Sequence, residues 1–153
     1  MTARDLSQDL AWLLQRNGQR LQAATDRTAL AHGLTGGLRD YVILVLLERE
    51  QPKTQNELGH LAGVDKTTLM AVLDRMEREG LVERRLDPKN RRVRIPVATA
   101  KGQKLLAAVT ASRRAAEEVP GMTATELKTL RKLLIRLDEA CEAAGLKFTG
   151  SCV

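Results

Sequence analysis

Apolar residues recur along most of the chain at the three- and four-residue spacing of an amphipathic helix. The first such segment predicts a helix from about Arg4 to Leu30, which ends at Gly33 because glycine readily adopts the left-handed conformation that closes a helix. The most apolar run, Tyr41 to Leu47, predicts a second helix that is buried on most sides. We expect Thr35 to be the N-cap of this helix and Pro52 to end it.

Two short predicted helices follow, separated by a glycine. Thr54 and Glu57 have the spacing of a capping box, and the helix that they begin ends at Gly63. Asp65 is the expected N-cap of the next helix, which continues to Gly80. Its predicted buried stripe consists of Leu69, Val72, Leu73 and Met76. Two helices joined in this way, the second longer and polar on one side, are typical of a helix-turn-helix.

After Gly80 the apolar pattern becomes strand-like. Residues 81–85 and 93–97 predict two short strands, and residues 87–90 predict the turn between them because Asp, Pro and Asn favour turn conformations. Pro96 restricts its strand to an edge, since proline has no N–H to donate. A two-stranded ribbon directly after a helix-turn-helix is a wing.

The last third of the chain predicts two more helices. One runs from about Thr99 to Val119, and the other begins at Thr123 in a second capping box. The last helix repeats Leu127, Leu130, Leu134 and Leu137. Together with Leu105 and Val109 of the preceding helix, these leucines offer more apolar face than one small lobe can cover. The predicted fold is therefore mainly α with a small two-stranded β wing, a winged helix-turn-helix with a helical dimerisation region.

The excess of basic residues indicates that the partner of this protein is a polyanion. The chain has 153 residues, the length of one domain, and its net charge is +6. Between Arg84 and Arg94 six basic residues are opposed by Asp87 alone, so this segment carries +5 of the total. Net charge alone fits nucleic acid or an anionic membrane. The position of the charge on a hairpin beside a helix-turn-helix favours nucleic acid.

The candidate DNA contacts lie on the second helix of the pair and on the wing. Exposed amides and the helix dipole at the first turn favour a phosphate, and basic side chains on a narrow ribbon reach phosphates or the minor groove. Thr68 has an alternative role, in which its hydroxyl only supports the helix cap. The candidates are Thr54, Lys66, Thr67, Thr68, Met70, Arg75, Arg84, Lys89, Asn90, Arg91, Arg92 and Arg94.

In this order and spacing, several segments resemble the MarR family of transcriptional regulators. The most recognisable is Leu73 to Arg84, LDRMEREGLVER. DPKNRR at 87–92 and ATAKG at 98–102 resemble the family's wing and its exit. Gly33-Leu34-Thr35 and Thr54 to Leu61 resemble the segments that open its second helix and its helix-turn-helix.

The resemblance implies a homodimer on a palindromic operator in double-stranded DNA. Residues 1–35 and 99–153 would form the dimerisation helices, and residues 36–98 the DNA-binding lobe. Many members release DNA when a small phenolic or otherwise anionic ligand enters a cleft between these regions. Trp12, His32, Arg39 and Tyr41 lie near the expected cleft, and packing or turn capping is the alternative explanation for them.

The sequence departs from the family at two positions. The wing usually carries Asp where Asn90 stands, and that Asp orients an Arg whose counterpart is Arg75. Asn90 can accept the same hydrogen bond without charge assistance. Ala71 stands where an Arg is frequent, so we expect the wing and DNA shape to contribute more to recognition.

Other classes of protein find little support in the sequence. No phosphate loop or catalytic motif is present, and we expect no enzyme activity, no cofactor and no metal. Cys141 fits packing on the last helix. Oxidant-sensing members of the family carry their reactive cysteine near the N-terminus, where this chain has none, so the resemblance disfavours redox sensing and leaves it open for Cys152 alone. The absence of a leader or apolar span predicts a cytoplasmic protein that does not bind membranes. A ligand-responsive repressor and a ligand-free DNA-binding protein, controlled by a partner or architectural, both remain open. An RNA-binding winged helix is weaker because the ribbon lacks stacking aromatics.

Overall fold

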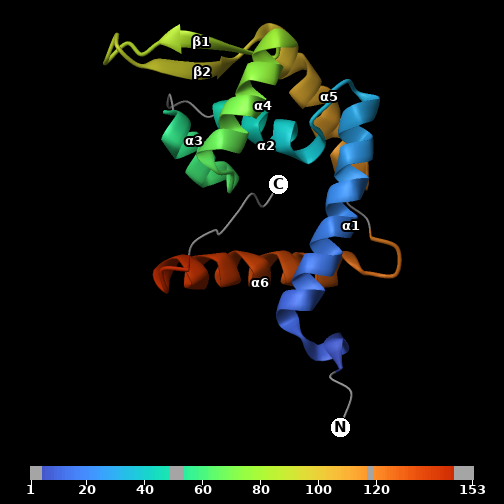
Figure 1. Ribbon diagram of the computed structural model, residues 1–153. Helices are drawn as coiled ribbons and strands as arrows, with labels where there is room; N and C mark the ends of the chain where they lie inside the picture. The colour runs from blue at the N-terminus through green and yellow to red at the C-terminus, as the bar shows by residue number, and fades with distance from the viewer. Residues whose placement is uncertain (1–4, 49–53, 117–118, 147–153) are drawn as a thin grey trace.

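The structure, a computed structural model, describes residues 5–48, 54–116 and 119–146 (Figure 1). It confirms a mainly α fold with one two-stranded antiparallel sheet. The elements in chain order are the 3-10 helix η1 (Leu6–Gln8), α1 (Leu10–Ala31), α2 (Gly37–Glu48), α3 (Gln55–Ala62), α4 (Lys66–Arg78), β1 (Val82–Leu86), β2 (Arg94–Ala98), α5 (Ala100–Ala116) and α6 (Ala124–Ala143).

The helix-turn-helix begins and ends where the sequence predicts. Thr54 caps α3 in a reciprocal capping box with Glu57. Gly63 closes α3 in the left-handed conformation, with a φ of 64°. Asp65 then caps α4 by accepting a hydrogen bond from the amide of Thr68 at 3.0 Å. Local polar chemistry therefore fixes the turn between the two helices.

The first two helices start later than predicted. Asp9 is the N-cap of α1, because its carboxylate accepts from the amide of Trp12. The prediction that Thr35 caps α2 is wrong: α2 begins at Gly37, and the Thr35 hydroxyl donates to Glu79 at 2.8 Å. The end of this helix predicted at Pro52 lies outside the described residues.

The wing is displaced by one residue from its predicted bounds. β1 pairs with β2 so that Val82 faces Ala98 and Leu86 faces Arg94. The turn forms as expected, since the carboxylate of Asp87 accepts from the amide of Lys89 at 2.8 Å. Both strands are edges, which accommodates the missing donor of a proline. Figure 1 shows the hairpin projecting from the lobe that contains α2, α3 and α4.

The core lies in this winged lobe and at its junction with α1 and α5. Its fully buried large side chains include Leu34, Ile43, Leu44, Leu58, Leu69, Leu73, Met76, Leu81, Val82 and Val109. In Figure 1 the N-terminal half of α1 and the whole of α6 lie outside the lobe. None of the residues of α6 is buried, and Cys141, expected to be buried, is half-exposed. Several apolar side chains of α1 and α6 are therefore open to solvent.

Candidate nucleic-acid interface

The first turn of α4 presents several of the predicted contact residues. Lys66, Thr67 and Met70 are exposed, and Met70 keeps 43% of its surface accessible. Thr68 is half-buried, and its hydroxyl donates to Asp65 at 2.6 Å. The alternative role of Thr68 as support for the cap therefore fits its geometry. The side chain of Thr54 is likewise bonded within its capping box. Among the predicted contacts of the helix-turn-helix, the exposed polar side chains are therefore those at the start of α4, Lys66 and Thr67.

The wing carries four basic side chains that are exposed and form no ion pair with any described residue: Lys89, Arg91, Arg92 and Arg94. They lie at the turn and at the first residue of β2. Asn90 is also exposed, and its side-chain oxygen accepts from the backbone amide of Arg92 at 3.1 Å. The free positive charge of the hairpin is thus concentrated at the end remote from the core.

The two basic residues nearer the lobe are already paired. Arg84 donates to Glu77 and, at 2.5 Å, to Asp74, both on α4, and only 16% of its side chain is exposed. Arg85 pairs with Glu83 on the same strand. Arg84 therefore joins the wing to α4 and is not a free cation in this structure, and its role as a DNA contact stays a prediction.

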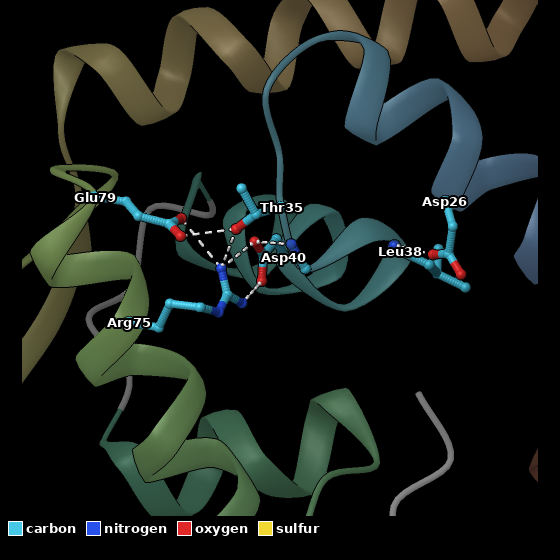
Figure 2. Close-up of polar contacts among 7 residues, drawn as sticks. Asp26, Thr35, Leu38, Asp40, Arg75 and Glu79 are labelled. Atoms are coloured by element: carbon cyan, nitrogen blue, oxygen red, sulfur yellow. Dashed lines mark hydrogen bonds and ion pairs between the residues drawn. The ribbon is translucent and has the colours of Figure 1, made fainter.

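Arg75 lies differently from the expectation that Asn90 would orient it. Its guanidinium makes two hydrogen bonds to the carboxylate of Asp40, at 2.5 and 2.9 Å, and one to the hydroxyl of Thr35 at 2.8 Å (Figure 2). A further bond reaches Glu79 one turn along α4. The hydrogen bonds from Arg75 to Asp40 raise the pKa of Arg75 above its ordinary value. Arg75 faces α2, and the predicted contact with Asn90 is wrong.

The predicted ligand residues do not form one cluster. His32 and Tyr41 both reach α5: the His32 Nε2 atom is 2.7 Å from the Ser112 hydroxyl, and the guanidinium of Arg113 lies 4.4 Å from the centre of the Tyr41 ring. Trp12 is on the exposed first turn of α1. It is separated from His32 by 20 residues of nearly continuous helix, about 30 Å at 1.5 Å per residue. Trp12 is therefore remote from the others within one chain.

Arg39 is the exceptional member of this group. Its Nε atom is buried and has no hydrogen-bond partner among the described residues. A buried donor without an acceptor is costly, and an anion or an ordered water molecule would satisfy it.

Sequence reasoning missed the residues that join α1, α2 and α4. Asp40 was not among the predicted site residues, although it is completely buried. Asp26 was not considered, yet its carboxylate accepts from the amide of Leu38 at 2.7 Å and so caps α2 from a different helix. Asp40 directly precedes the most apolar run of the chain, and a charged residue in that position could have indicated a buried, paired carboxylate. No local pattern marks Asp26.

Neither a membrane-spanning helix nor a metal site is present in the part of the chain that the structure describes. No helix there is long and apolar enough to cross a membrane. No group of three or more His, Cys, Asp or Glu side chains there is arranged to hold a metal ion.

A helix-turn-helix followed by a two-stranded basic hairpin defines the winged-helix class of transcriptional regulators. Comparison with known proteins places the chain more narrowly. It belongs to the MarR family, whose sequence profile matches residues 38–93. The members of this family are transcriptional regulators and not enzymes, as the sequence predicts.

Individual relatives agree over nearly the whole chain. The HTH-type transcriptional repressor NicR of Pseudomonas putida is 29% identical over 146 residues, which cover 94% of this chain and 91% of NicR. The structure of CouR from Rhodococcus jostii RHA1 bound to p-coumaroyl-CoA is 30% identical, covers 86% of this chain and 93% of its own, and has a TM-score of 0.72. A MarR-family regulator from Rhodococcus sp. RHA1 is 31% identical, with coverages of 86% and 94% and a TM-score of 0.71.

Proposed function

We propose that this regulator is a repressor that binds a palindromic operator as a homodimer and releases it when a small aromatic or anionic effector binds. The observation that carries the DNA-binding part is the unpaired positive charge at the end of the wing, on the same lobe as the exposed first turn of α4. A helix turn and a basic ribbon together match the major groove and the adjacent backbone or minor groove.

Within this proposal the contacts divide by chemistry. Lys66 and the amides of the first turn of α4 bind phosphate, and Thr67 and Met70 face base edges, where apolar groups contact the thymine methyl. The exposed wing residues Lys89, Asn90, Arg91, Arg92 and Arg94 bind phosphates or enter the minor groove. Thr54, Thr68, Arg75 and Arg84 support these elements from within the lobe.

The dimer is proposed from the uncovered apolar surface outside the lobe. Leu130, Leu133, Leu134 and Ile135 of α6 each keep at least 40% of their surface exposed, and Leu10 and Leu21 of α1 keep more than half. An apolar face of this extent marks an interaction surface in a protein that remains in solution. We assign residues 1–35 and 99–153 to the dimerisation region and residues 36–98 to the DNA-binding lobe.

The DNA-binding proposal is tested by selecting duplexes from a random-sequence library with the purified protein and measuring affinity for the selected duplex as a function of salt. The variant Arg91→Ala/Arg92→Ala should bind every duplex more weakly, and its salt slope should fall by about 2 because two phosphate contacts are lost. The variant Lys128→Ala/Lys132→Ala loses the same charge on the polar side of α6 and should keep the parent slope. Equal slopes for all three proteins would remove the wing from the interface.

The effector part rests on the buried donor of Arg39 on α2, which has no acceptor among the described residues. A carboxylate or another anion would supply the missing acceptor of Arg39. The relative CouR was solved with p-coumaroyl-CoA, an aromatic thioester that carries anionic phosphates. The chemistry of that ligand agrees with a site of this kind.

The effector is tested by adding p-coumaroyl-CoA, free p-coumarate or benzoate to the protein–DNA complex. Release of DNA by one of them, abolished in Arg39→Met and retained in Arg20→Met on exposed α1, supports the site. Release that persists in Arg39→Met refutes it. If none of the three compounds releases DNA, the alternative of a regulator without a ligand, controlled by a partner protein, gains the support.

A further inference from the structure

Among the described residues, Asp40 is the one charged side chain that is fully buried. A buried carboxylate is tolerated only when its oxygens accept hydrogen bonds. The oxygens of Asp40 accept them from two donors, the side chain of Arg75 and the backbone of Gly36. The Arg75 guanidinium supplies a bidentate pair from α4, and the amide of Gly36 donates at 2.9 Å from the loop before α2. Asp40 therefore joins α4, the second helix of the helix-turn-helix and its recognition helix, to the junction of α1 and α2.

Further hydrogen bonds connect the C-terminal turn of α4 to the loop before α2 and to α5. Thr35 accepts from Arg75 and donates to Glu79, the C-cap residue of α4 (Figure 2). The backbone carbonyl of Glu79 accepts from the ammonium group of Lys101 on α5 at 2.7 Å. The C-terminal end of α4 is thus bonded to the loop between α1 and α2 and to α5, both outside the helix-turn-helix.

The backbone at Gly36 and Gly37 is packed so closely against neighbouring side chains that it has no space for a Cβ atom. A Cβ atom at Gly36 would overlap the carboxylate of Asp40 and the guanidinium of Arg75. A Cβ atom at Gly37 would overlap the carboxylate of Asp26, which comes from α1. Two adjacent glycines therefore let one carboxylate from α1 and one from α2 hold the same stretch of backbone.

We infer that the Asp40–Arg75 pair is a positioning element that fixes the angle of α4 relative to α1, and through it the half-site spacing that the dimer accepts. This inference rests on the proposed dimeric DNA binding. The Cα atoms of Arg75 and Lys66 are nine residues apart on α4, about 14 Å at 1.5 Å per residue. A tilt of about 14° at Arg75 would shift the first turn by about 3.4 Å, the rise of one base pair.

The pair is suited to this role because its geometry resists small rotations. Two parallel N–H···O bonds fix the plane of the guanidinium as well as its distance from the carboxylate. Rotation of α4 would break both bonds and leave a buried charge unpaired. Since α1 belongs to the proposed dimerisation region, the pair transmits the separation of the two α1 helices to the separation of the two recognition helices.

The test compares half-site spacing in the parent and in Asp40→Asn/Arg75→Gln, which removes both charges and leaves the net charge unchanged. The probe is the duplex that the parent selects from a random library, together with versions with one or two base pairs inserted or deleted between the half-sites. We expect the parent to lose at least tenfold in affinity per changed spacing. The double variant should discriminate less than threefold between spacings and keep the parent's salt slope. The control Lys132→Gln/Glu139→Gln, on the polar side of α6, should behave as the parent.

Loss of stability alone lowers the folded fraction equally for every duplex and cannot change the spacing profile, so the readout separates positioning from folding. A folded double variant that keeps the parent's profile overturns the inference and leaves the proposed function intact. A parent that enriches no duplex overturns the proposed function and the inference together. If the double variant does not fold, Arg75→Lys retains the charge without the bidentate geometry. A flattened profile for that variant supports the inference, and an unchanged profile overturns it.

Discussion

The two halves of the Asp40–Arg75 pair should differ in what their removal does to stability. In Arg75→Gln the Asp40 carboxylate remains, with none of its surface exposed and only the Gly36 amide as a donor. Leaving one member of a buried pair without its partner costs about 3–5 kcal/mol. In Asp40→Asn the guanidinium remains, but 28% of its side chain is exposed and it keeps its bonds to Thr35 and Glu79. That loss should be close to one charged hydrogen bond, about 1.5–3 kcal/mol.

The measurement is urea denaturation followed by far-ultraviolet circular dichroism. It uses one fixed protein concentration because the stability of the proposed dimer would depend on concentration. The double variant Asp40→Asn/Arg75→Gln should lose less than the sum of the two single losses, since neither charge is left alone. A smaller loss for Arg75→Gln than for Asp40→Asn would refute the assignment of the unpaired buried charge to Asp40.

Three further outcomes are expected. Leu134→Arg/Leu137→Arg should convert the proposed dimer to monomers or aggregates, as seen by light scattering, because charge is placed on the apolar face of α6. An unmodified protein that is monomeric at micromolar concentration would contradict this. Gly36→Ala should destabilise the protein, since its Cβ would overlap Asp40 and Arg75, whereas Gly18→Ala in open space on α1 should stabilise it by about 0.5–1 kcal/mol; urea midpoints that move the same way would contradict the packing argument. The Thr68 hydroxyl and amide lower the pKa of Asp65 below 3.8, so the charge on Asp65 stabilises the fold above that pH and the contribution is lost as pH falls; the stability gap between the parent and Asp65→Asn should shrink below about pH 4 in acid denaturation.

The elements that were predicted well are those encoded by neighbouring residues. Thr54 and Thr123 each begin a helix because a glutamate three residues later completes the capping box, and both boxes form. Gly63 ends α3 for an equally local reason, its tolerance of positive φ. The wing was located to within one residue because a proline-containing turn separates two short alternating segments.

The parts that were predicted wrongly depend on contacts between distant residues. Thr35 has the chemistry of an N-cap, but a hydroxyl serves equally well in a tertiary bond, and Glu79 and Arg75 occupy it. Arg84 belongs to a basic run in the sequence, yet the fold brings the carboxylates of α4 against it. Charge counted along a chain therefore overstates the charge that a surface offers. Partners 35 residues apart, such as Asp40 and Arg75, leave no periodic trace.

The ion pairs that Arg84 and Arg85 form with glutamate and aspartate side chains have a consequence for the rate of DNA binding. The hairpin's unpaired cations are confined to its turn and the start of β2, far from the lobe. Charge at the end of a projecting arm meets an approaching polyanion first, so it acts on the rate of encounter, whereas groups buried on docking act on the lifetime of the complex. Raising the salt concentration should therefore slow association of DNA through the wing, while dissociation should depend mainly on how α4 fits the groove.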